Sequence, residues 1–270
     1  MSLPQCKELL LDLHQGVLSI TLNRPHKRNA MNSQLVMEMM AALKSIKDDR
    51  SVRIIVLRGK DGNFCAGGDI SGMNEVSADQ LQGRDASWHF NRSFGHLISQ
   101  LNKAPQIVIA LLEGAVLGGG FGLACVSDVA IADKNAMFAM PETGLGIVPA
   151  QIGPFVVARI GITQARRLAL LGERVNGTLA QQLGLVHHVV DGEAPLLEKL
   201  NEVCDMAMRC APQATAISKQ LLLDVSETLV VESILDHAAD EFTKAMLSDE
   251  GQEGTRAFVD KRKPKWAKKL

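Results

Sequence analysis

Two glycine-rich segments contain the residues whose spacing could do chemistry. The first is Ala66-Gly67-Gly68-Asp69, and the second is the triplet Gly118-Gly119-Gly120. Glycine is favoured where the backbone needs a positive φ or where another group approaches it closely. A glycine triplet that opens a helix leaves N–H groups without intrahelical partners, and these groups can face a developing negative charge. One N–H from each segment would form a two-donor oxyanion hole. Either segment alone fits a tight turn equally well.

The same glycine segments do not match the motifs of a dinucleotide-binding site or a P-loop, and motifs of serine hydrolases and metal sites are absent from the sequence. The segment 118–123 does not complete a G-x-G-x-x-G dinucleotide motif, because Leu123 occupies the third glycine position. Gly114 and Gly119 have P-loop spacing, but Gly120 stands where the lysine belongs. The sequence has no G-x-S-x-G elbow. Its seven histidines show no HExxH spacing, so we expect no metal site.

The elements that must position these segments alternate between strands and helices. Alternating or continuous apolar patterns predict strands over residues 17–23, 53–59, 106–114, 128–133 and 136–142. Asn32 or Ser33 is expected to cap a helix, and a helix-rich stretch is expected over roughly 78–102. From about residue 154 the pattern is helical, with Pro212 in the first turn of one helix. We therefore expect one body built from a repeated strand–strand–helix unit, followed by a helical part.

The composition and charge of the chain limit the kinds of binding partner that we expect. Its 270 residues are 46% hydrophobic, and its net charge of −1 gives no general reason to expect nucleic acid or a membrane surface as a partner. The five cysteines form no CxxC pair, and no apolar run reaches membrane-spanning length, so a cytoplasmic protein is expected. After residue 260 the chain has six basic residues and no acidic one. This tail is either a solvated end or a clamp for phosphate groups.

Five segments resemble, in order and spacing, the enoyl-CoA hydratase (crotonase) family. They are NRPHKRNAM (23–31), FCAGGDI (64–70), EGAVLGGGFGLACVSDVAIAD (113–133), FAMPETGLGIVP (138–149) and GLVHHVV (184–190). The resemblance implies an α/β crotonase (ClpP-like) fold, with a spiral of ββα repeats over residues 1–205. A helical region over 206–270, part of the same body, would support trimerisation. It also implies a CoA thioester substrate, no separate cofactor, and a homotrimer or dimer of trimers.

The resemblance also implies catalytic roles. The oxyanion donors would be the N–H groups of Gly68 and Gly119, and Glu142 would manage protons. The best-known hydratases carry a second glutamate three residues beyond the middle glycine, where this sequence has Gly122. Either Glu142 serves in both proton transfers, or a loop carboxylate substitutes for the second acid. Glu142 could instead be a structural acid paired with an arginine.

Coenzyme A binding is implied for three groups of residues. Arg24, Lys27 and Arg28 correspond to the loop on the nucleotide side. Backbone contacts to adenine and pantetheine are implied for Ala30, Ala66, Asp69 and Ile70. Phe258 and Lys261 resemble an aromatic and basic pair that extends towards the CoA of a neighbouring subunit.

The run 141–170, with Pro-Ala-x-Ile-x-Pro-Phe-Val-Val, resembles bacterial hydratases of branched glutaconyl-CoA thioesters. It is most similar to the isohexenylglutaconyl-CoA hydratases of acyclic terpene degradation, and the methylglutaconyl-CoA hydratases of leucine catabolism are near neighbours. Both substrates carry a distal carboxylate that needs a cation or strong donors, for which Arg84 and Arg92 are candidates. Each arginine also fits a surface position. An enoyl-CoA isomerase and a catalytically silent CoA-binding protein are the rival interpretations.

Overall fold

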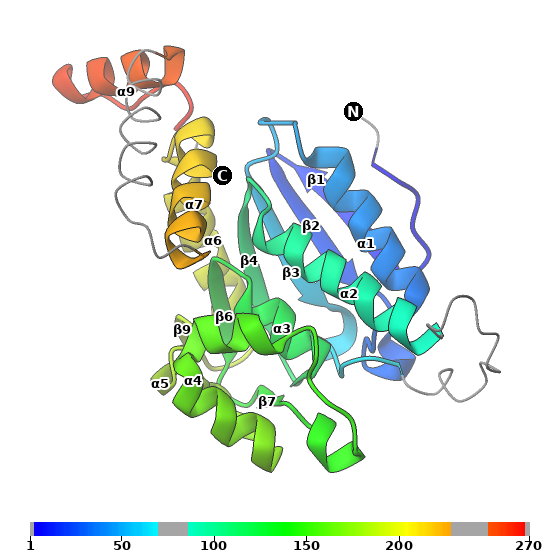
Figure 1. Ribbon diagram of the computed structural model, residues 1–270. Coiled ribbons are helices and arrows are strands. Elements are labelled where there is room, and N and C mark those ends of the chain that lie inside the picture. Colours follow the sequence, from blue (N-terminus) through cyan, green and yellow to red (C-terminus); the bar gives the residue numbers. More distant parts are fainter. Residues whose placement is uncertain (1–2, 70–85, 228–247, 268–270) are drawn as a thin grey trace.

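A mixed six-stranded sheet forms the centre of the molecule (Figure 1). The structure is a computed structural model and describes residues 3–69, 86–227 and 248–267. In spatial order the strands are β1 (Leu9–His14), β2 (Val17–Leu22), β3 (Ile54–Gly59), β4 (Ile107–Leu112), β6 (Val129–Asp133) and β9 (His188–Val190). The edge pair β1–β2 is antiparallel, and all other neighbours in this sheet are parallel. Parallel order requires crossover connections, and the helices provide them.

A second, smaller sheet and the helices complete the fold. The small sheet contains β5 (Ala115–Leu117), β7 (Met137–Ala139) and β8 (Val175–Asn176). The helices are α1 (Ser33–Ile46), α2 (Ala86–Asn102), α3 (Gly119–Cys125), α4 (Gly153–Leu171), α5 (Gly177–Gln182), α6 (Glu193–Met208), α7 (Pro212–Glu227) and α9 (Asp249–Val259). Short 3-10 helices are η1 (Pro25–Lys27), η2 (Lys60–Gly62) and η4 (Glu142–Leu145). In the described ranges, no helix is both long and apolar enough to cross a membrane.

The large sheet is buried on both faces, as the continuous apolar strands predict. Along β4, Val108 and Ala110 belong to the larger core cluster, which includes residues of α1, α2 and α3. The alternating residues Ile109 and Leu111 belong to a second cluster with residues of α6. Figure 1 accordingly shows α1 and α2 on one side of the sheet and α6 on the other.

Local sequence signals explain the start of α1. The Asn32 side chain accepts a hydrogen bond from Leu35 N at 2.9 Å, which satisfies one of the N–H groups left over at the helix terminus. The apolar residues of this helix face the sheet, and Leu35, Met39 and Ile46 are fully buried. Of the two caps that the sequence allowed, Asn32 is the one observed, and Ser33 is the first residue of the helix.

Local sequence patterns predicted the central strands but gave wrong bounds for other elements. The predicted strands over 17–23, 53–59 and 128–133 are confirmed, but the range 106–114 ends as a strand at Leu112. The glycine triplet consequently follows β5 of the small sheet, not the buried strand directly. The edge strand β1 was not predicted because it mixes buried and exposed leucines. The helix expected over 78–102 is described from Ala86, and the division of the body at 205/206 stays a prediction.

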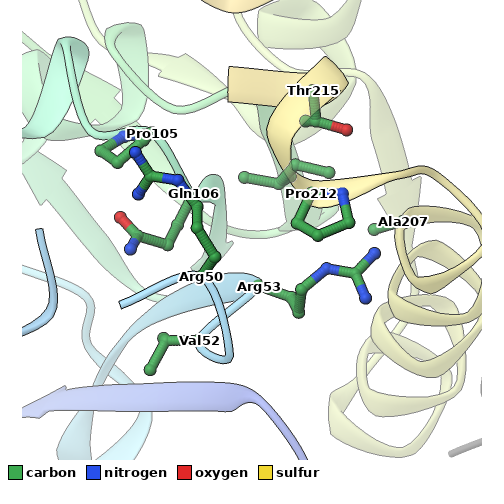
Figure 2. A pocket seen from close by; sticks show the side chains of 9 residues that line it. Arg50, Val52, Arg53, Pro105, Gln106, Ala207, Pro212 and Thr215 are labelled. Atoms are coloured by element: carbon green, nitrogen blue, oxygen red, sulfur yellow. The ribbon is translucent and has the colours of Figure 1, made fainter. Parts of the chain in front are cut away.

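The C-terminal helices are attached to the sheet through polar contacts. Lys219 Nζ on α7 donates to Ala104 O at 2.9 Å and to Gln106 O at 2.7 Å, and it forms an ion pair with Asp128. Arg53 donates to Cys210 O from the neighbouring end of β3. We call this region the C-terminal seam. Figure 2 shows its small pocket, of about 10 Å³, where Arg50 and Arg53 lie between the sheet and the helices.

Candidate active site

A short parallel pairing places the two glycine turns side by side. Cys65 pairs with Val116 in an isolated parallel bridge, with N–H···O bonds of 2.8 and 2.9 Å on either side of it. Parallel chains advance together with an even spacing of hydrogen bonds. Gly68 and Gly119 each lie three residues beyond this bridge in their own segment, so they are expected at corresponding positions.

The turns are close because they consist of glycine. Gly67 and Gly118 have φ values of +102° and +50°, which L side chains rarely adopt. A Cβ on Gly118 would lie 3.6 Å from the Cα of Gly67 and 2.9 Å from Oε1 of Glu142. The two turns and the carboxylate therefore meet at one place.

The N–H groups of Gly68 and Gly119 are directed away from the neighbouring backbone. Met31 N donates to Gly67 O, and Asp69 N donates to Met31 O, both at 2.8 Å. In this parallel pairing the N–H of the intervening Gly68 points to the opposite side. Gly119 is the first residue of α3, so its N–H has no partner within the helix. Across the described part of the chain, neither N–H has a hydrogen-bond acceptor.

The Cys65 thiol lies beneath these turns and supports them. It is completely buried and accepts a hydrogen bond from Gly67 N at 3.4 Å. Burial raises the pKa of the Cys65 thiol to about 12, although N–H groups of Gly67 and Gly120 oppose this rise. A thiol with that pKa stays protonated near neutral pH, which argues against a nucleophile and for a buried packing residue.

Glu142 begins the short helix η4 directly after Pro141. Its Oε2 atom is buried without a hydrogen-bond partner among the described residues, and no described arginine forms an ion pair with it. Burial raises the pKa of Glu142, while a hydrogen bond from its own backbone N–H partly opposes that rise. The alternative of a structural acid paired with an arginine therefore has no support in the described contacts.

The best-known hydratases have a second glutamate at the position of Gly122, and in this protein apolar side chains fill the space next to that glycine. A Cβ on Gly122 would lie 2.3 Å from Cγ2 of Ile152 and 3.0 Å from Cδ1 of Ile98. A glutamate at Gly122 would have to displace both isoleucines. Of the described residues that line the cavity, Asp69 also carries a carboxylate, but it accepts a hydrogen bond from Arg24. No described loop carboxylate is thus placed as a substitute.

These groups line a cavity of about 760 Å³. Its walls come from η1, the two glycine turns, α2 and the segment 141–152. Apolar side chains form a large part of it: Trp88, Phe90, Phe94, Leu145, Ile147, Val148 and Ile152. These apolar side chains explain why Glu142 is desolvated, and the cavity they line has space for an apolar ligand group.

Only some of the residues expected to bind CoA lie together in the wall of the cavity. Lys27, Arg28, Ala30, Ala66 and Asp69 line the cavity, and the first two side chains are exposed. Ile70 lies outside the described residues.

Arg24 occupies a different position from the one expected of a phosphate-binding residue. Its side chain is 9% exposed, pairs with Asp69 at 2.8 Å and Glu8 at 3.1 Å, and donates to Ala30 O. The guanidinium holds the loop together, because these acceptors surround it inside the protein. Arg24 therefore lies outside the proposed binding site.

The C-terminal pair is remote from the cavity within one chain. Phe258 belongs to α9, and its side chain lies outside the described residues. Lys261 is exposed just beyond the helix, whereas no described residue after Ile152 lines the cavity. Figure 1 places α9 beside α7, away from α3. Arg262, in the same basic tail, forms hydrogen bonds of 2.7 and 3.1 Å with Glu253.

One polar contact in the cavity wall was not predicted from the sequence. Gln151 Nε2 donates to Asn91 Oδ1 at 2.9 Å, joining the segment before α4 to α2. Both residues line the cavity. The only available signal was the place of Gln151 within the distinctive run 149–157.

Comparisons with known proteins agree with this architecture. A family model described as enoyl-CoA hydratase/isomerase matches residues 12–269. The solved structure of Pseudomonas aeruginosa AtuE is similar to this one, with a TM-score of 0.93. The two sequences are 54% identical, and the match covers 97% of this chain and 100% of that chain. An enoyl-CoA hydratase/isomerase from Marinobacter aquaeolei is 50% identical, with a TM-score of 0.94 and the same coverage. The 2,3-dehydroadipyl-CoA hydratase of Escherichia coli (strain K12) is 33% identical over 95% of this chain and 97% of its own length.

The family match spans far more than half of the chain, and the relatives are covered over almost their full lengths. The expected α/β crotonase fold is confirmed by these neighbours. The relatives named as hydratases act on enoyl-CoA thioesters. The similarity to several relatives named as hydratases supports a hydratase-type enzyme acting on CoA thioesters, and the chain belongs to the enoyl-CoA hydratase/isomerase family.

Proposed function

We propose that this enzyme adds water to the α,β double bond of a branched glutaconyl-type CoA thioester. The proposed substrate is isohexenylglutaconyl-CoA of acyclic terpene degradation, and methylglutaconyl-CoA of leucine catabolism is the alternative. One observation carries the proposal: two N–H groups without described acceptors and a desolvated glutamate line the same largely apolar cavity. A relative named for dehydroadipyl-CoA also supports a dicarboxylic substrate, because adipate is a dicarboxylic acid.

In the proposed reaction, the thioester oxygen accepts hydrogen bonds from Gly68 N and Gly119 N. When the oxygen of water bonds to Cβ, the double-bond electrons shift towards the carbonyl and place negative charge on the thioester oxygen. The two donors stabilise this enolate more than the neutral thioester, which lowers the barrier. One donor of this kind contributes roughly 2.7–4 kcal/mol.

Glu142 completes the proposed proton balance. Its carboxylate removes one proton from the attacking water and then delivers a proton to Cα of the enolate, which regenerates the carboxylate. Because isoleucines occupy the space beside Gly122, the same carboxyl group serves in both transfers. Its raised pKa favours this double role, since a group that gains and loses a proton works best near the ambient pH.

Coenzyme A would lie across the mouth of the cavity. The exposed side chains of Lys27 and Arg28 would bind its phosphates, and backbone groups of Ala30, Ala66 and Asp69 would contact adenine and pantetheine.

Phe258 and Lys261 would come from a neighbouring copy in a homotrimer or dimer of trimers. Lys261→Gln should then weaken binding of a CoA ester more at low salt than at high salt, because salt screens exposed charges. A salt-independent loss of affinity would contradict this phosphate contact.

A substrate screen tests the proposed function. We expect kcat/KM for hydration to be higher with methylglutaconyl-CoA or isohexenylglutaconyl-CoA than with crotonyl-CoA. Preference for crotonyl-CoA would overturn the substrate class and leave the family assignment intact.

An enoyl-CoA isomerase is the second candidate, because one glutamate beside apolar side chains suits proton transfer without water. Reaction in 18O-labelled water separates the two activities. Hydration puts the label into the product, whereas double-bond migration does not.

A further inference from the structure

A polar cluster in the α2 wall of the cavity is not used by the proposed mechanism. The cluster consists of Asn91 and Gln151, which line the cavity, and Arg92, which lies behind the lining residues and contacts Gln151. Gln151 Nε2 donates to Asn91 Oδ1 at 2.9 Å, and Arg92 Nη1 approaches Gln151 Oε1 at 3.5 Å. The latter contact is at the outer limit for a hydrogen bond, so the guanidinium keeps donors for a stronger acceptor.

The fold makes room for this cluster at a glycine. A Cβ on Gly95 would lie 1.9 Å from Gln151 Oε1 and 2.6 Å from Arg92 Nη1. Gly95 lies inside α2, where glycine is less favourable than alanine. The close approach of the amide and the guanidinium therefore depends on the missing side chain.

The guanidinium of Arg92 has no ionic partner within the described chain. It is partly buried, and no described carboxylate forms an ion pair with it. A partly desolvated cation beside a cavity is best satisfied by an anionic ligand.

The cluster is also close to the reacting end of the cavity. A Cβ on Gly68 would lie 3.7 Å from Phe90, and a Cβ on Gly119 would lie 3.2 Å from Phe94. Phe90 directly precedes Asn91 on α2, and Phe94 is one turn beyond it. Asn91 and Gln151 line the same cavity as the two glycine turns, so an acyl chain held at the turns can reach their amides, with Arg92 next to Gln151.

We propose that the Asn91–Arg92–Gln151 cluster binds the distal carboxylate of the acyl chain and selects dicarboxylic thioesters. Carboxylate oxygens accept hydrogen bonds only, which matches the N–H donors of a guanidinium and an amide. This inference rests on the proposed function, because it assigns a binding group to the second carboxylate of that substrate class. Arg92 and the two amides are specificity residues in this proposal and take no part in proton transfer.

Two substrates that differ only at the distal group test the proposal. 3-Methylglutaconyl-CoA carries a CH2–COO⁻ group where 3-methylcrotonyl-CoA carries a methyl group. The variants are Arg92→Met, which removes the charge; Arg92→Lys, which keeps it; and Gly95→Ala, which displaces Gln151 without removing a polar group. Arg209→Met, at an exposed arginine on the far side of the sheet, is the matched control.

We expect Arg92→Met to lower kcat/KM for 3-methylglutaconyl-CoA by about 10- to 100-fold, chiefly through KM, because it removes a charge-assisted hydrogen bond. Hydration of 3-methylcrotonyl-CoA should change less than about twofold. Arg92→Lys should restore part of the loss, and Gly95→Ala should reproduce the selective loss. Calorimetric binding of 3-methylglutaryl-CoA and isovaleryl-CoA, which cannot be hydrated, should show the same selectivity in Kd.

The outcomes separate the two levels of the proposal. If the wild-type enzyme prefers 3-methylglutaconyl-CoA and both Arg92→Met and Gly95→Ala keep that preference, this inference is overturned and the proposed function stands. Equal losses for both substrates would make Arg92 a structural residue and would also overturn the inference. If the wild-type enzyme itself shows no preference for the dicarboxylic substrate, the proposed substrate class fails.

Discussion

The C-terminal seam pairs the charged side chains of Lys219 and Arg53, whereas the cavity around Glu142 leaves hydrogen-bonding groups unpaired within the described residues. At the seam, Lys219 Nζ reaches three acceptors. Arg53, which lines a pocket of about 10 Å³, donates to a backbone carbonyl. In the cavity of about 760 Å³, Gly68 N, Gly119 N and Glu142 Oε2 have no described partners. The first arrangement attaches helices to a sheet, and the second leaves hydrogen-bonding capacity for a ligand.

The energetic difference explains why both arrangements occur in one molecule. A buried polar group without a partner costs about 1–3 kcal/mol of stability. The seam avoids that cost by satisfying its charged donors. In the cavity this cost in stability remains, and the same unsatisfied groups can bind a substrate. Substitutions at the two regions should therefore separate activity from stability.

Glu142→Gln should produce the largest effect, in the cavity alone. Loss of the proton-transferring carboxylate should lower kcat for hydration by about 10²- to 10⁴-fold, which is the usual contribution of general acid–base catalysis. The folded state should remain intact, as measured by thermal unfolding. Glu198→Gln, at an exposed glutamate on α6, is the control for loss of one charge. Near-normal turnover by Glu142→Gln would remove this residue from the mechanism.

Lys219→Met should produce the converse result at the seam. It leaves two backbone carbonyls and Asp128 without their donor, so the free energy of unfolding should fall by about 1–3 kcal/mol. Urea titration measures that loss, and kcat should be unchanged where the variant is folded. Lys263→Met, at an exposed lysine, should leave stability unaltered. If Lys219→Met lost activity but not stability, the contrast between the regions would be wrong.

Gly122→Glu tests whether the cavity can accept the second family glutamate. The added side chain would collide with Ile152 and Ile98, and overpacking of this kind costs about 1–3 kcal/mol. We expect a lower unfolding midpoint in urea and no gain in kcat. Faster hydration without loss of stability would show that this space is available for a second acid.

The pH dependence of stability should show the smallest effect. The pKa of Glu142 in the folded protein is raised above its ordinary value of 4.5, so ionisation favours the unfolded state. The stability that the protonated carboxyl contributes is complete below 4.5 and is lost as pH rises through the folded-state pKa. Glu142→Gln should consequently be more stable than the wild type near pH 7, with the difference closing below pH 4.5. Thermal unfolding across this range measures it, and the opposite trend would mean that the carboxylate has a stabilising partner.

Much of the reacting end was predictable because backbone requirements are local. The helix cap at Asn32 and the glycine turns follow from short motifs whose φ values and N–H groups depend on adjacent residues. The double burial of β4 also follows from its own apolar run. The proximity of Glu142 to Gly118 was expected from the family resemblance, and the structure supplies the geometry.

The sequence by itself determined three strands of the large sheet and the two glycine turns, because neighbouring residues set their conformations. The role of Glu142 came from the family resemblance and stays a prediction. Only the tertiary structure decided which polar side chains are already engaged. The sequence predicts a phosphate contact for Arg24, but its guanidinium pairs with Asp69. For Arg92 the sequence allows either a ligand contact or a surface position, and the structure places it beside Gln151. The physical reason is that desolvation and hydrogen-bond pairing depend on partners far away in the chain, which a local pattern does not contain.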